Sequence, residues 1–228
     1  MQSKRALIVL GGEFPPPDWL KSLHHPDDIV IAADRGALLC EAAQLPLSVL
    51  VGDFDSLDSA DSLTYARPQE IERFPTDKDF SDGELALLCA QRRGCPNAVL
   101  VAALGGRLDH CLFNIVALLE KAEQLGLTAE IAAPETAIFQ LAEGQRHQLS
   151  YAANSWCSLI SLDRRSTVSL QGLLYSGDAI MLERASTRGL SNVILDPSSA
   201  SIRVTEGQLL VIVSSRDISP SHPLGGVR

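Results

Sequence analysis

The sequence predicts an N-terminal α/β domain of three layers, built on a parallel sheet, followed by a C-terminal β-sandwich domain. Two observations carry this prediction. Over the first 133 residues, short apolar runs alternate with longer segments of helical spacing, whereas short stretches of alternating polar and apolar residues follow Pro134. A chain of 228 residues is long enough for two small domains. We expect the α/β domain over residues 1–135 and the β-sandwich over residues 145–220.

Four continuously apolar runs in the first part are typical of strands that are covered on both faces. These runs are residues 6–10, 29–33, 49–51 and 98–103. Helical spacing predicts helices over residues 37–44, 80–93 and 108–125. The second helix begins with the capping signature Ser81-Asp82-Gly83-Glu84 and stops at Gly94. Strands and helices that alternate in this way predict a parallel sheet with helices on both sides.

The second part of the chain predicts strands throughout. Residues 201–205, for example, read Ser-Ile-Arg-Val-Thr, and such alternation places every second side chain on the same face of a sheet. Gly and Asn punctuate these stretches at the spacing of turns. We therefore expect a small β-sandwich.

Charge and cysteine content narrow the choice of partners and of compartment. The formal net charge is −9 with only four lysines, whereas nucleic acids and anionic membranes are bound through excess Lys and Arg. An acidic protein can still bind a phosphate ligand when a divalent cation neutralises both partners. No stretch approaches the roughly 18 apolar residues of a membrane span, and no signal peptide is evident. Five cysteines without a Cys-x-x-Cys pair favour reduced core residues, and hence a cytoplasmic protein.

Aspartates follow most of the predicted strands, at the end where ligands bind in open parallel sheets. Asp34 follows the second strand, and Asp53 and Asp55 follow the third. Seven aspartates lie between residues 53 and 82: Asp53, Asp55, Asp58, Asp61, Asp77, Asp79 and Asp82. Converging carboxylates repel one another unless a metal ion lies between them, and oxygen ligands of this kind suit Mg²⁺.

A second interpretation of these aspartates stays open. Asp55 and Asp58 could cap the next helix, and Asp61 could simply be solvated, because Asp is favoured at helix starts. A helix start also explains one of the three aspartates at 77, 79 and 82. After the strand at 98–103, Gly105-Gly106-Arg107 is either a plain turn or a close backbone approach to phosphate, with Arg107 bonded to anionic oxygens.

Four segments of the first part, in their order, resemble the thiamine pyrophosphokinase family. They are ADRGA (33–37), GDFDS (52–56), PTDKDFSDGELAL (75–87) and GGRLDH (105–110). In the second part, residues 172–192 end in Gly-Leu-Ser-Asn and look like the thiamine-binding sandwich of that family. The resemblance covers nearly the whole chain.

The resemblance implies transfer of a pyrophosphoryl group from ATP to the hydroxyl of thiamine, giving thiamine diphosphate and AMP. It also implies a homodimer, with the thiamine site between the α/β domain of one subunit and the sandwich of the other. The resemblance implies that the catalytic ligands of Mg²⁺ are Asp53, Asp55 and Asp82. It implies that five residues lie at the nucleotide, at its phosphates or in the same crevice: Asp34, Lys78, Ser81, Arg107 and Asp109. It places Ser191 and Asn192 at the pyrimidine ring of thiamine. The general base stays open between Asp82, Asp53 and bulk water.

Two other functions compete with this reading of the sequence. Asp53-Phe54-Asp55 has the spacing of a haloacid-dehalogenase-type phosphohydrolase, in which the first carboxylate is the nucleophile. A non-catalytic sensor of thiamine or nucleotide would keep the fold without turnover. The complete set of aspartates argues against the sensor.

Overall fold

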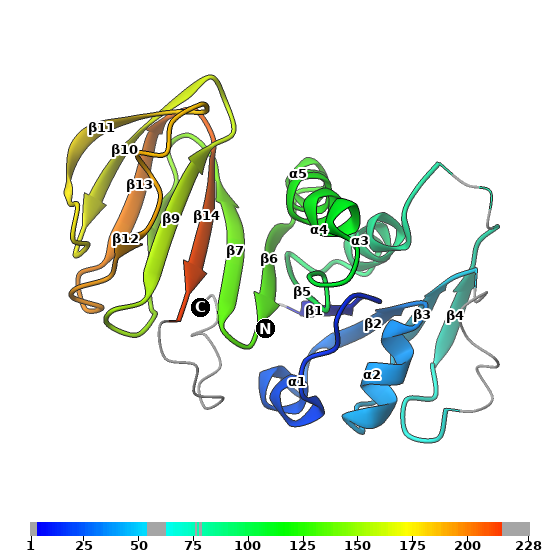
Figure 1. Ribbon diagram of the computed structural model, residues 1–228. Coiled ribbons are helices and arrows are strands. Elements are labelled where there is room, and N and C mark those ends of the chain that lie inside the picture. The colour runs from blue at the N-terminus through cyan, green and yellow to red at the C-terminus, as the bar shows by residue number, and fades with distance from the viewer. Residues whose placement is uncertain (1–3, 54–62, 76, 78, 216–228) are drawn as a thin grey trace. The chain divides into compact units, whose positions relative to one another are not determined.

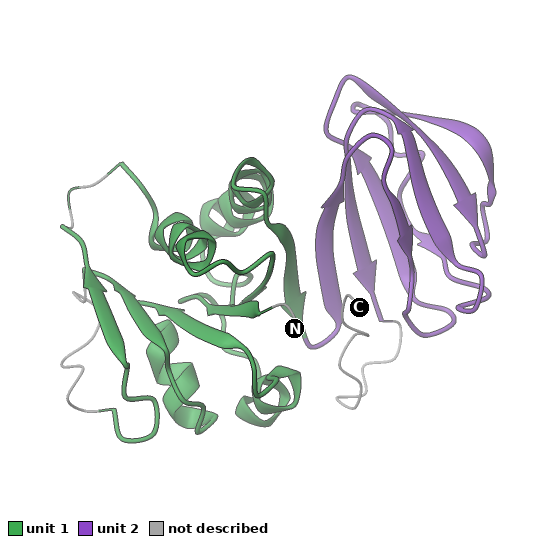
Figure 2. Cartoon of the chain, turned by 180° about the vertical axis from the view of Figure 1, so that it is seen from behind, with its two compact units in different colours: residues 1–133 green, residues 134–228 purple. Residues whose placement is uncertain are grey.

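The computed structural model describes residues 4–53, 63–75, 77 and 79–215. The chain divides into two compact units, residues 1–133 and residues 134–228 (Figure 2). The first unit is α/β and the second is all-β, which confirms the predicted fold class.

The described residues of unit 1 form a parallel sheet of six strands (Figure 1). In chain order these are β1 (Arg5–Val9), β2 (Ile29–Ala33), β3 (Val49–Gly52), β4 (Glu70–Arg73), β5 (Asn97–Val101) and β6 (Thr128–Ala133). They lie side by side in the order β6-β5-β1-β2-β3-β4, and each strand runs parallel to its neighbours. The central strands are almost entirely buried, as their continuous apolar sequences predict.

Helices cover both faces of this sheet (Figure 1). One face carries α1 (Pro17–Leu23) and α2 (Gly36–Ala42), and the other carries α3 (Asp82–Arg92), α4 (Leu108–Phe113), the π-helical turn η2 (Asn114–Leu118) and α5 (Leu119–Gln124). Side chains alternate along each strand, so Leu7 and Val9 of β1 pack in one core cluster with Trp19 of α1 and Leu39 of α2.

Two of these helical segments differ from the sequence prediction. Helix α1 was not expected; its first residue is Pro17, a position where proline is favoured. The helix expected over 108–125 is instead three consecutive segments, in which the π-helical turn at Asn114–Leu118 separates α4 from α5. The capping box predicted at Ser81 is present, since Ser81 Oγ accepts from Glu84 N.

The described residues of unit 2 form a sandwich of two antiparallel sheets. The strands are β7 (Thr136–Leu141), β8 (Arg146–Gln148), β9 (Trp156–Ser161), β10 (Arg165–Gln171), β11 (Gly177–Glu183), β12 (Asn192–Val193), β13 (Ser201–Glu206) and β14 (Leu209–Ser214). One sheet has the order β12-β9-β14-β7 and the other β11-β10-β13-β8. Alternate residues such as Val211 and Val213 on β14 and Ile202 and Val204 on β13 join one buried cluster between the sheets.

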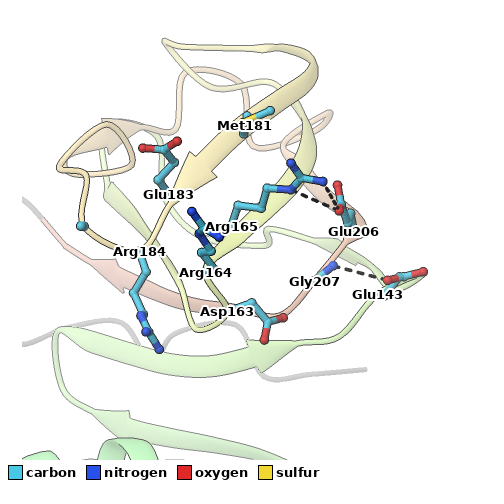
Figure 3. A pocket seen from close by; sticks show the side chains of 10 residues that line it. Glu143, Asp163, Arg164, Arg165, Met181, Glu183, Arg184, Glu206 and Gly207 are labelled. Atoms are coloured by element: carbon cyan, nitrogen blue, oxygen red, sulfur yellow. Dashed lines mark hydrogen bonds and ion pairs between the residues drawn. The ribbon is translucent and has the colours of Figure 1, made fainter.

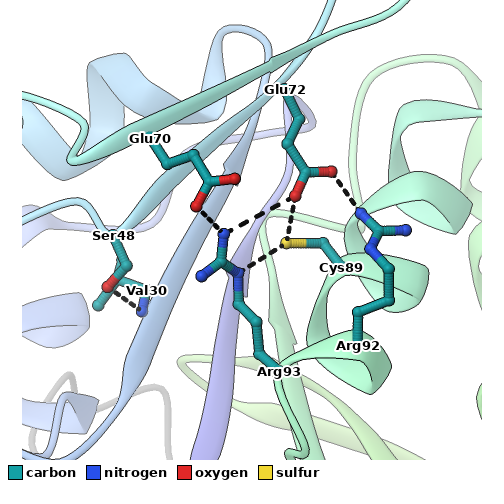
Figure 4. A network of polar contacts seen from close by, with 7 residues as sticks. All are labelled: Val30, Ser48, Glu70, Glu72, Cys89, Arg92 and Arg93. Atoms are coloured by element: carbon teal, nitrogen blue, oxygen red, sulfur yellow. Dashed lines mark hydrogen bonds and ion pairs between the residues drawn. The ribbon is translucent and has the colours of Figure 1, made fainter.

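A polar network ties the outer strand of the unit 1 sheet to the end of α3 (Figure 4). Arg93 forms an ion pair with Glu70, and Arg92 forms one with Glu72. The Cys89 thiol donates to Glu72 Oε1 at 3.4 Å and accepts from Arg93 Nε at 3.3 Å. The network therefore joins β4 to the C-terminal end of α3, which is the end away from Asp82.

Candidate active site

The strand order of unit 1 places a crevice at the carboxyl ends of its central strands. From β1 the chain moves outward through β2, β3 and β4 on one side, and β5 and β6 lie on the other side. The connections therefore diverge between β1 and β5, the position where open α/β sheets bind ligands. A cavity of about 690 Å³ lies at the loops that follow β1, β2 and β5 and at the start of α3; among the residues that line it are Gly11, Gly12, Glu13, Asp34, Arg35, Ser81, Asp82, Gly105, Gly106, Arg107, His110 and Asn114. We call it the switch-point cleft.

Two loops that line the switch-point cleft are hydrogen-bonded to each other. The loop after β1 runs beside the segment after β5, where Gly12 N donates to Ala102 O and Glu13 N donates to Leu104 O, each at 2.8 Å. Gly105 has a φ of +81°, and a Cβ added there would lie 2.3 Å from the Cβ of Glu13. Glycine is therefore required at 105 both by the backbone and by the side chain that lies against it.

The carboxylate of Asp34 lies beside the residue that precedes Asp53. Asp34 itself has a φ of +44°, and its backbone N donates to Val51 O at 3.0 Å. Gly52 has a φ of +149°, and a Cβ added there would lie only 1.8 Å from Asp34 Oδ1. The ends of β2 and β3 thus bring together two aspartates that the sequence predicts to be functional. Asp53 is half-buried.

The start of α3 supplies a third aspartate to the switch-point cleft. Ser81 is the N-cap, and its backbone N donates to Glu84 Oε2 at 3.1 Å, which completes the capping box. Asp82 follows as the first helical residue, where the helix dipole favours a negative charge. Both Ser81 and Asp82 line the cleft, and the Ser81 hydroxyl already takes part in the cap.

Arg107 and Asp109 form a bidentate ion pair at the mouth of the cleft. Arg107 Nε donates to Asp109 Oδ1 at 3.1 Å, and Nη2 donates to Oδ2 at 2.5 Å. The hydrogen bonds from Arg107 lower the pKa of Asp109 to about 2, and those to Asp109 raise the pKa of Arg107. Both side chains are exposed, so the pair contributes little to stability, but it holds the guanidinium in one orientation.

The predicted aspartates are only partly covered by the described residues. Asp55 and Lys78, together with Asp58 and Asp61, lie outside the described residues. Within the part of the chain that the structure describes, no three His, Cys, Asp or Glu side chains lie close enough together to hold a metal ion. The metal ligands Asp53, Asp55 and Asp82 therefore stay a prediction.

The cleft also contains residues that the sequence did not single out. Asn114 lines it, and its Nδ2 donates to Ala103 O at 2.7 Å. Arg35 lies with its guanidinium 5.4 Å from the centre of the Phe14 ring. One signal for Asn114 was present, because it follows His110 by four residues on a predicted helix and so shares its face.

In unit 2, the two predicted thiamine contacts differ in what surrounds them. Asn192 is 5% exposed; its Nδ2 donates to Tyr175 O at 3.1 Å and its Oδ1 accepts from Tyr175 N at 2.9 Å. Its amide thus holds the turn at Tyr175 against β12. Ser191 is exposed, with a φ of +57°, and its backbone N donates to Ser158 Oγ at 3.0 Å. Direct contact of either side chain with thiamine stays a prediction.

A second cavity, of about 950 Å³, lies within unit 2 (Figure 3). Three arginines and four carboxylates line it: Arg164, Arg165, Arg184, Glu143, Asp163, Glu183 and Glu206. Arg165 is paired with Glu206 at 3.0 Å, and Gly207 N donates to Glu143 Oε2 at 3.4 Å. The positive and negative charges around this cavity therefore nearly balance.

These features define an α/β unit with a cleft at the switch point of its parallel sheet, followed by a β-sandwich. Two family models match the chain: "Thiamin pyrophosphokinase, catalytic domain" over residues 20–129 and "Thiamin pyrophosphokinase, vitamin B1 binding domain" over residues 146–209. The first range includes Asp34, Asp53 and Asp82, and the second includes Ser191 and Asn192.

Solved structures agree with these matches. A thiamin pyrophosphokinase from Geobacillus thermodenitrificans is 30% identical, with 94% of this chain and 99% of that chain covered and a TM-score of 0.80. A thiamine pyrophosphokinase from Bacillus subtilis shares the fold at 22% identity, with 93% and 100% covered and a TM-score of 0.80. That of Candida albicans does so at 16% identity, with 94% and 90% covered and a TM-score of 0.76. A search of curated protein sequences gave no match.

The chain belongs to the thiamin pyrophosphokinase family, and it is an enzyme of thiamine pyrophosphorylation. None of the helices in the described ranges is long and apolar enough to cross a membrane.

Proposed function

We propose that this enzyme transfers a pyrophosphoryl group from ATP to the hydroxyl of thiamine, giving thiamine diphosphate and AMP, with Mg²⁺ as its cofactor. One observation carries the proposal. The switch-point cleft has Asp34 and Asp82 among its lining, with Asp53 beside Asp34, and it has the Gly105–Gly106 turn with Arg107 on the side of β5. Acidic groups for a metal thus share a cleft with a glycine turn and a guanidinium suited to phosphate oxygens.

The chemistry of the donors fits Mg²⁺. Asp53 and Asp82, with Asp55, would hold the ion through carboxylate oxygens, which are the ligands that Mg²⁺ prefers. When bound, the ion neutralises negative charge on the phosphate oxygens. Lys78 and Ser81 would contact the phosphates or the substrate, and Asp34 would lie near the nucleotide.

The protein's own residues then have a positioning task, because phosphoryl-type transfer needs little covalent help from the protein. The oxygen of the thiamine hydroxyl bonds to the β-phosphorus of ATP. The bond from that phosphorus to the oxygen of the α-phosphate breaks, and AMP leaves with the electron pair. The hydroxyl proton passes to a carboxylate of the cleft or to water. Arg107, oriented by Asp109, stabilises the charge on the transferred oxygens.

Thiamine itself would contact Ser191 and Asn192 of unit 2. We infer that the enzyme acts as a homodimer, in which the active sites lie at the subunit interface. Light scattering on the purified protein tests this inference, since a mass close to 24.5 kDa would exclude the dimer.

Product analysis is the direct test of the reaction. The purified protein is incubated with ATP, Mg²⁺ and thiamine, and the nucleotides and thiamine species are separated by chromatography. Equimolar AMP and thiamine diphosphate are expected. ADP with thiamine monophosphate would contradict pyrophosphoryl transfer, and free phosphate with a trapped aspartyl-phosphate would instead indicate the hydrolase.

Replacement of the cleft carboxylates tests their role. Asp53→Asn and Asp82→Asn keep the shape of the side chains but remove charge, so turnover should fall by roughly two to three orders of magnitude. Asp27→Asn is the matched control, because Asp27 is exposed in the turn before β2, at the opposite end of that strand from the cleft. Near-normal turnover in both cleft variants would refute the metal assignment.

A further inference from the structure

The turn that presents Arg107 is conformationally demanding. Ala102, Gly105 and Gly106 all have positive φ, at +54°, +81° and +73°. Non-glycine residues are strained in this region, so Ala102 in particular must be held there by its surroundings. A turn of this kind keeps one geometry only when other contacts fix it.

Two side chains of the following helix donate hydrogen bonds to this turn. The Cys111 thiol donates to Gly105 O at 3.2 Å, and Asn114 Nδ2 donates to Ala103 O at 2.7 Å. The two residues are three apart and so lie on the same face of the helical segment. Both bonds stabilise the turn, and the thiol bond does so less because S–H is a weak donor.

The same helical segment also contacts the opposite side of the cleft. Asn114 begins the π-helical turn η2, and Leu118 ends it. A Cβ added to Gly83 would lie 2.8 Å from Leu118 Cδ1, so η2 packs directly against the residue that follows Asp82. Such π-turns are rare and often occur at functional sites. Here η2 spans from the Gly105–Gly106 turn to the start of α3.

From these contacts we propose that Cys111 and Asn114 are positioning residues of the switch-point cleft. They hold the turn at residues 103–107, and through it the guanidinium of Arg107, at a fixed place relative to Asp82. This inference rests on the proposed function, because it takes the ligand of the turn to be the phosphates of a nucleotide. Neither residue needs to touch the reacting atoms.

Nucleotide binding tests this role without depending on turnover. Titration calorimetry with ATP and Mg²⁺ is carried out on the full-length wild type and on the variants Asn114→Ala, Cys111→Ala and Cys111→Ser. We expect Kd to rise about tenfold for Asn114→Ala and about threefold for Cys111→Ala. Cys111→Ser keeps a donor and should recover most of the affinity that Cys111→Ala loses. Asn97→Ala is the control; Asn97 lies at the start of β5, the end away from the cleft.

A double-mutant cycle with Arg107→Ala separates positioning from general damage. If Asn114 acts through the turn, Asn114→Ala should weaken ATP binding by less than twofold once Arg107 has been removed. KM for thiamine should stay within twofold of the wild type. An undiminished tenfold loss in the Arg107→Ala background, or equal losses for ATP and thiamine with a lowered melting temperature, would contradict the proposal.

The outcomes also distinguish this inference from the proposed function. If Asn114→Ala and Cys111→Ala both bind ATP with wild-type affinity, the positioning role is refuted, and the proposed reaction is not affected. If the wild type binds ATP with Mg²⁺ but releases no AMP, the proposed reaction is refuted. The double-mutant cycle measured by ATP binding then still tests the positioning role. If the wild type binds no ATP, both the proposed reaction and the positioning role are refuted.

Discussion

The shape of the switch-point cleft depends on single glycines that let neighbouring side chains approach the backbone closely. Gly52 leaves room for the carboxylate of Asp34, and Gly105 leaves room for the side chain of Glu13. In each case a methyl group would enter space that a polar side chain already occupies. The geometry of the acidic groups therefore depends on residues that themselves carry no functional atoms.

Gly105→Ala tests this dependence. The alanine would be forced to a positive φ and would also meet Glu13, so we expect a loss of about 2–4 kcal/mol in unfolding free energy, together with weaker binding of ATP. Gly126→Ala is the matched control, because Gly126 has a φ of +74° with open space around it; it should lose only about 1 kcal/mol. Urea unfolding measures both. Equal losses of unfolding free energy in the two variants would show that the contact with Glu13 does not add to the cost of an alanine at position 105.

The sequence predicted many of the cleft residues because they belong to short motifs at strand ends. Each of them lies next to a strand or helix that its own apolar pattern predicts: Asp34, Asp53, Ser81, Asp82 and Arg107. Asn114 and Cys111 could not be predicted in the same way. Their role depends on a π-helical turn and on two carbonyls of the turn after β5, which the sequence does not reveal; the spacing of Asn114 from His110 indicates only a shared helix face.

At the scale of elements, charged side chains decide how the outer strands of the unit 1 sheet are held. Strand β4 is mostly exposed, and its link to α3 is the network of Glu70, Glu72, Arg92 and Arg93 with Cys89 (Figure 4). Burial is the main cause of the raised pKa of Cys89, so this thiol stays protonated and acts as a hydrogen-bond partner. Exposed ion pairs are weak singly, but several in one network restrict the strand more firmly.

Strand β6 carries a buried carboxyl group, Glu130, which is 6% exposed. Burial raises its pKa to about 7 from an ordinary value of 4.5, and the charge of Arg5 opposes this rise. The folded protein thus holds this proton more tightly than the unfolded chain does. Stability contributed by the neutral form is complete below pH 4.5 and is lost as the pH rises through about 7.

Glu130→Gln should therefore stabilise the protein above pH 7, by on the order of 2–3 kcal/mol, and the gain should disappear near pH 4.5. Urea unfolding at pH 5 and pH 8 measures the difference. Glu183→Gln, at an exposed position on β11, is the control and should give no such pH-dependent gain. A gain for Glu130→Gln that is the same at both pH values would mean that the carboxyl group does not titrate between them.

At the scale of the whole molecule, the chain joins two units, each with a hydrophobic core of its own. The unit 1 core lies against the parallel sheet, and the unit 2 core lies between two antiparallel sheets. The change from continuous apolar runs to alternating ones made this division predictable, because the two patterns correspond to sheets covered on two faces and on one. The π-helical turn was not predictable, because it lies inside a stretch whose helical spacing is continuous, and helix α1 was not expected either.

We expect residues 1–135 alone to fold and to bind ATP with Mg²⁺ but not thiamine. Every residue that lines the switch-point cleft belongs to this part of the chain, whereas the vitamin B1 binding model matches residues 146–209. Calorimetry with each ligand tests this expectation, and circular dichroism checks that the fragment is folded. Binding of thiamine by the fragment would mean that the sandwich is not required for it, and an unfolded fragment would mean that unit 1 depends on unit 2.

The charged strand at the end of the unit 1 sheet also bears on behaviour at high concentration. In the described residues β4 pairs only with β3, so it forms one edge of the unit 1 sheet. A strand of another molecule could add to such an edge and begin a fibre. Three of the four residues of β4 are Glu70, Glu72 and Arg73, and adding a strand would crowd these charges together and disturb the ion pairs with α3. The charges that join β4 to α3 therefore also protect this edge of the sheet from aggregation.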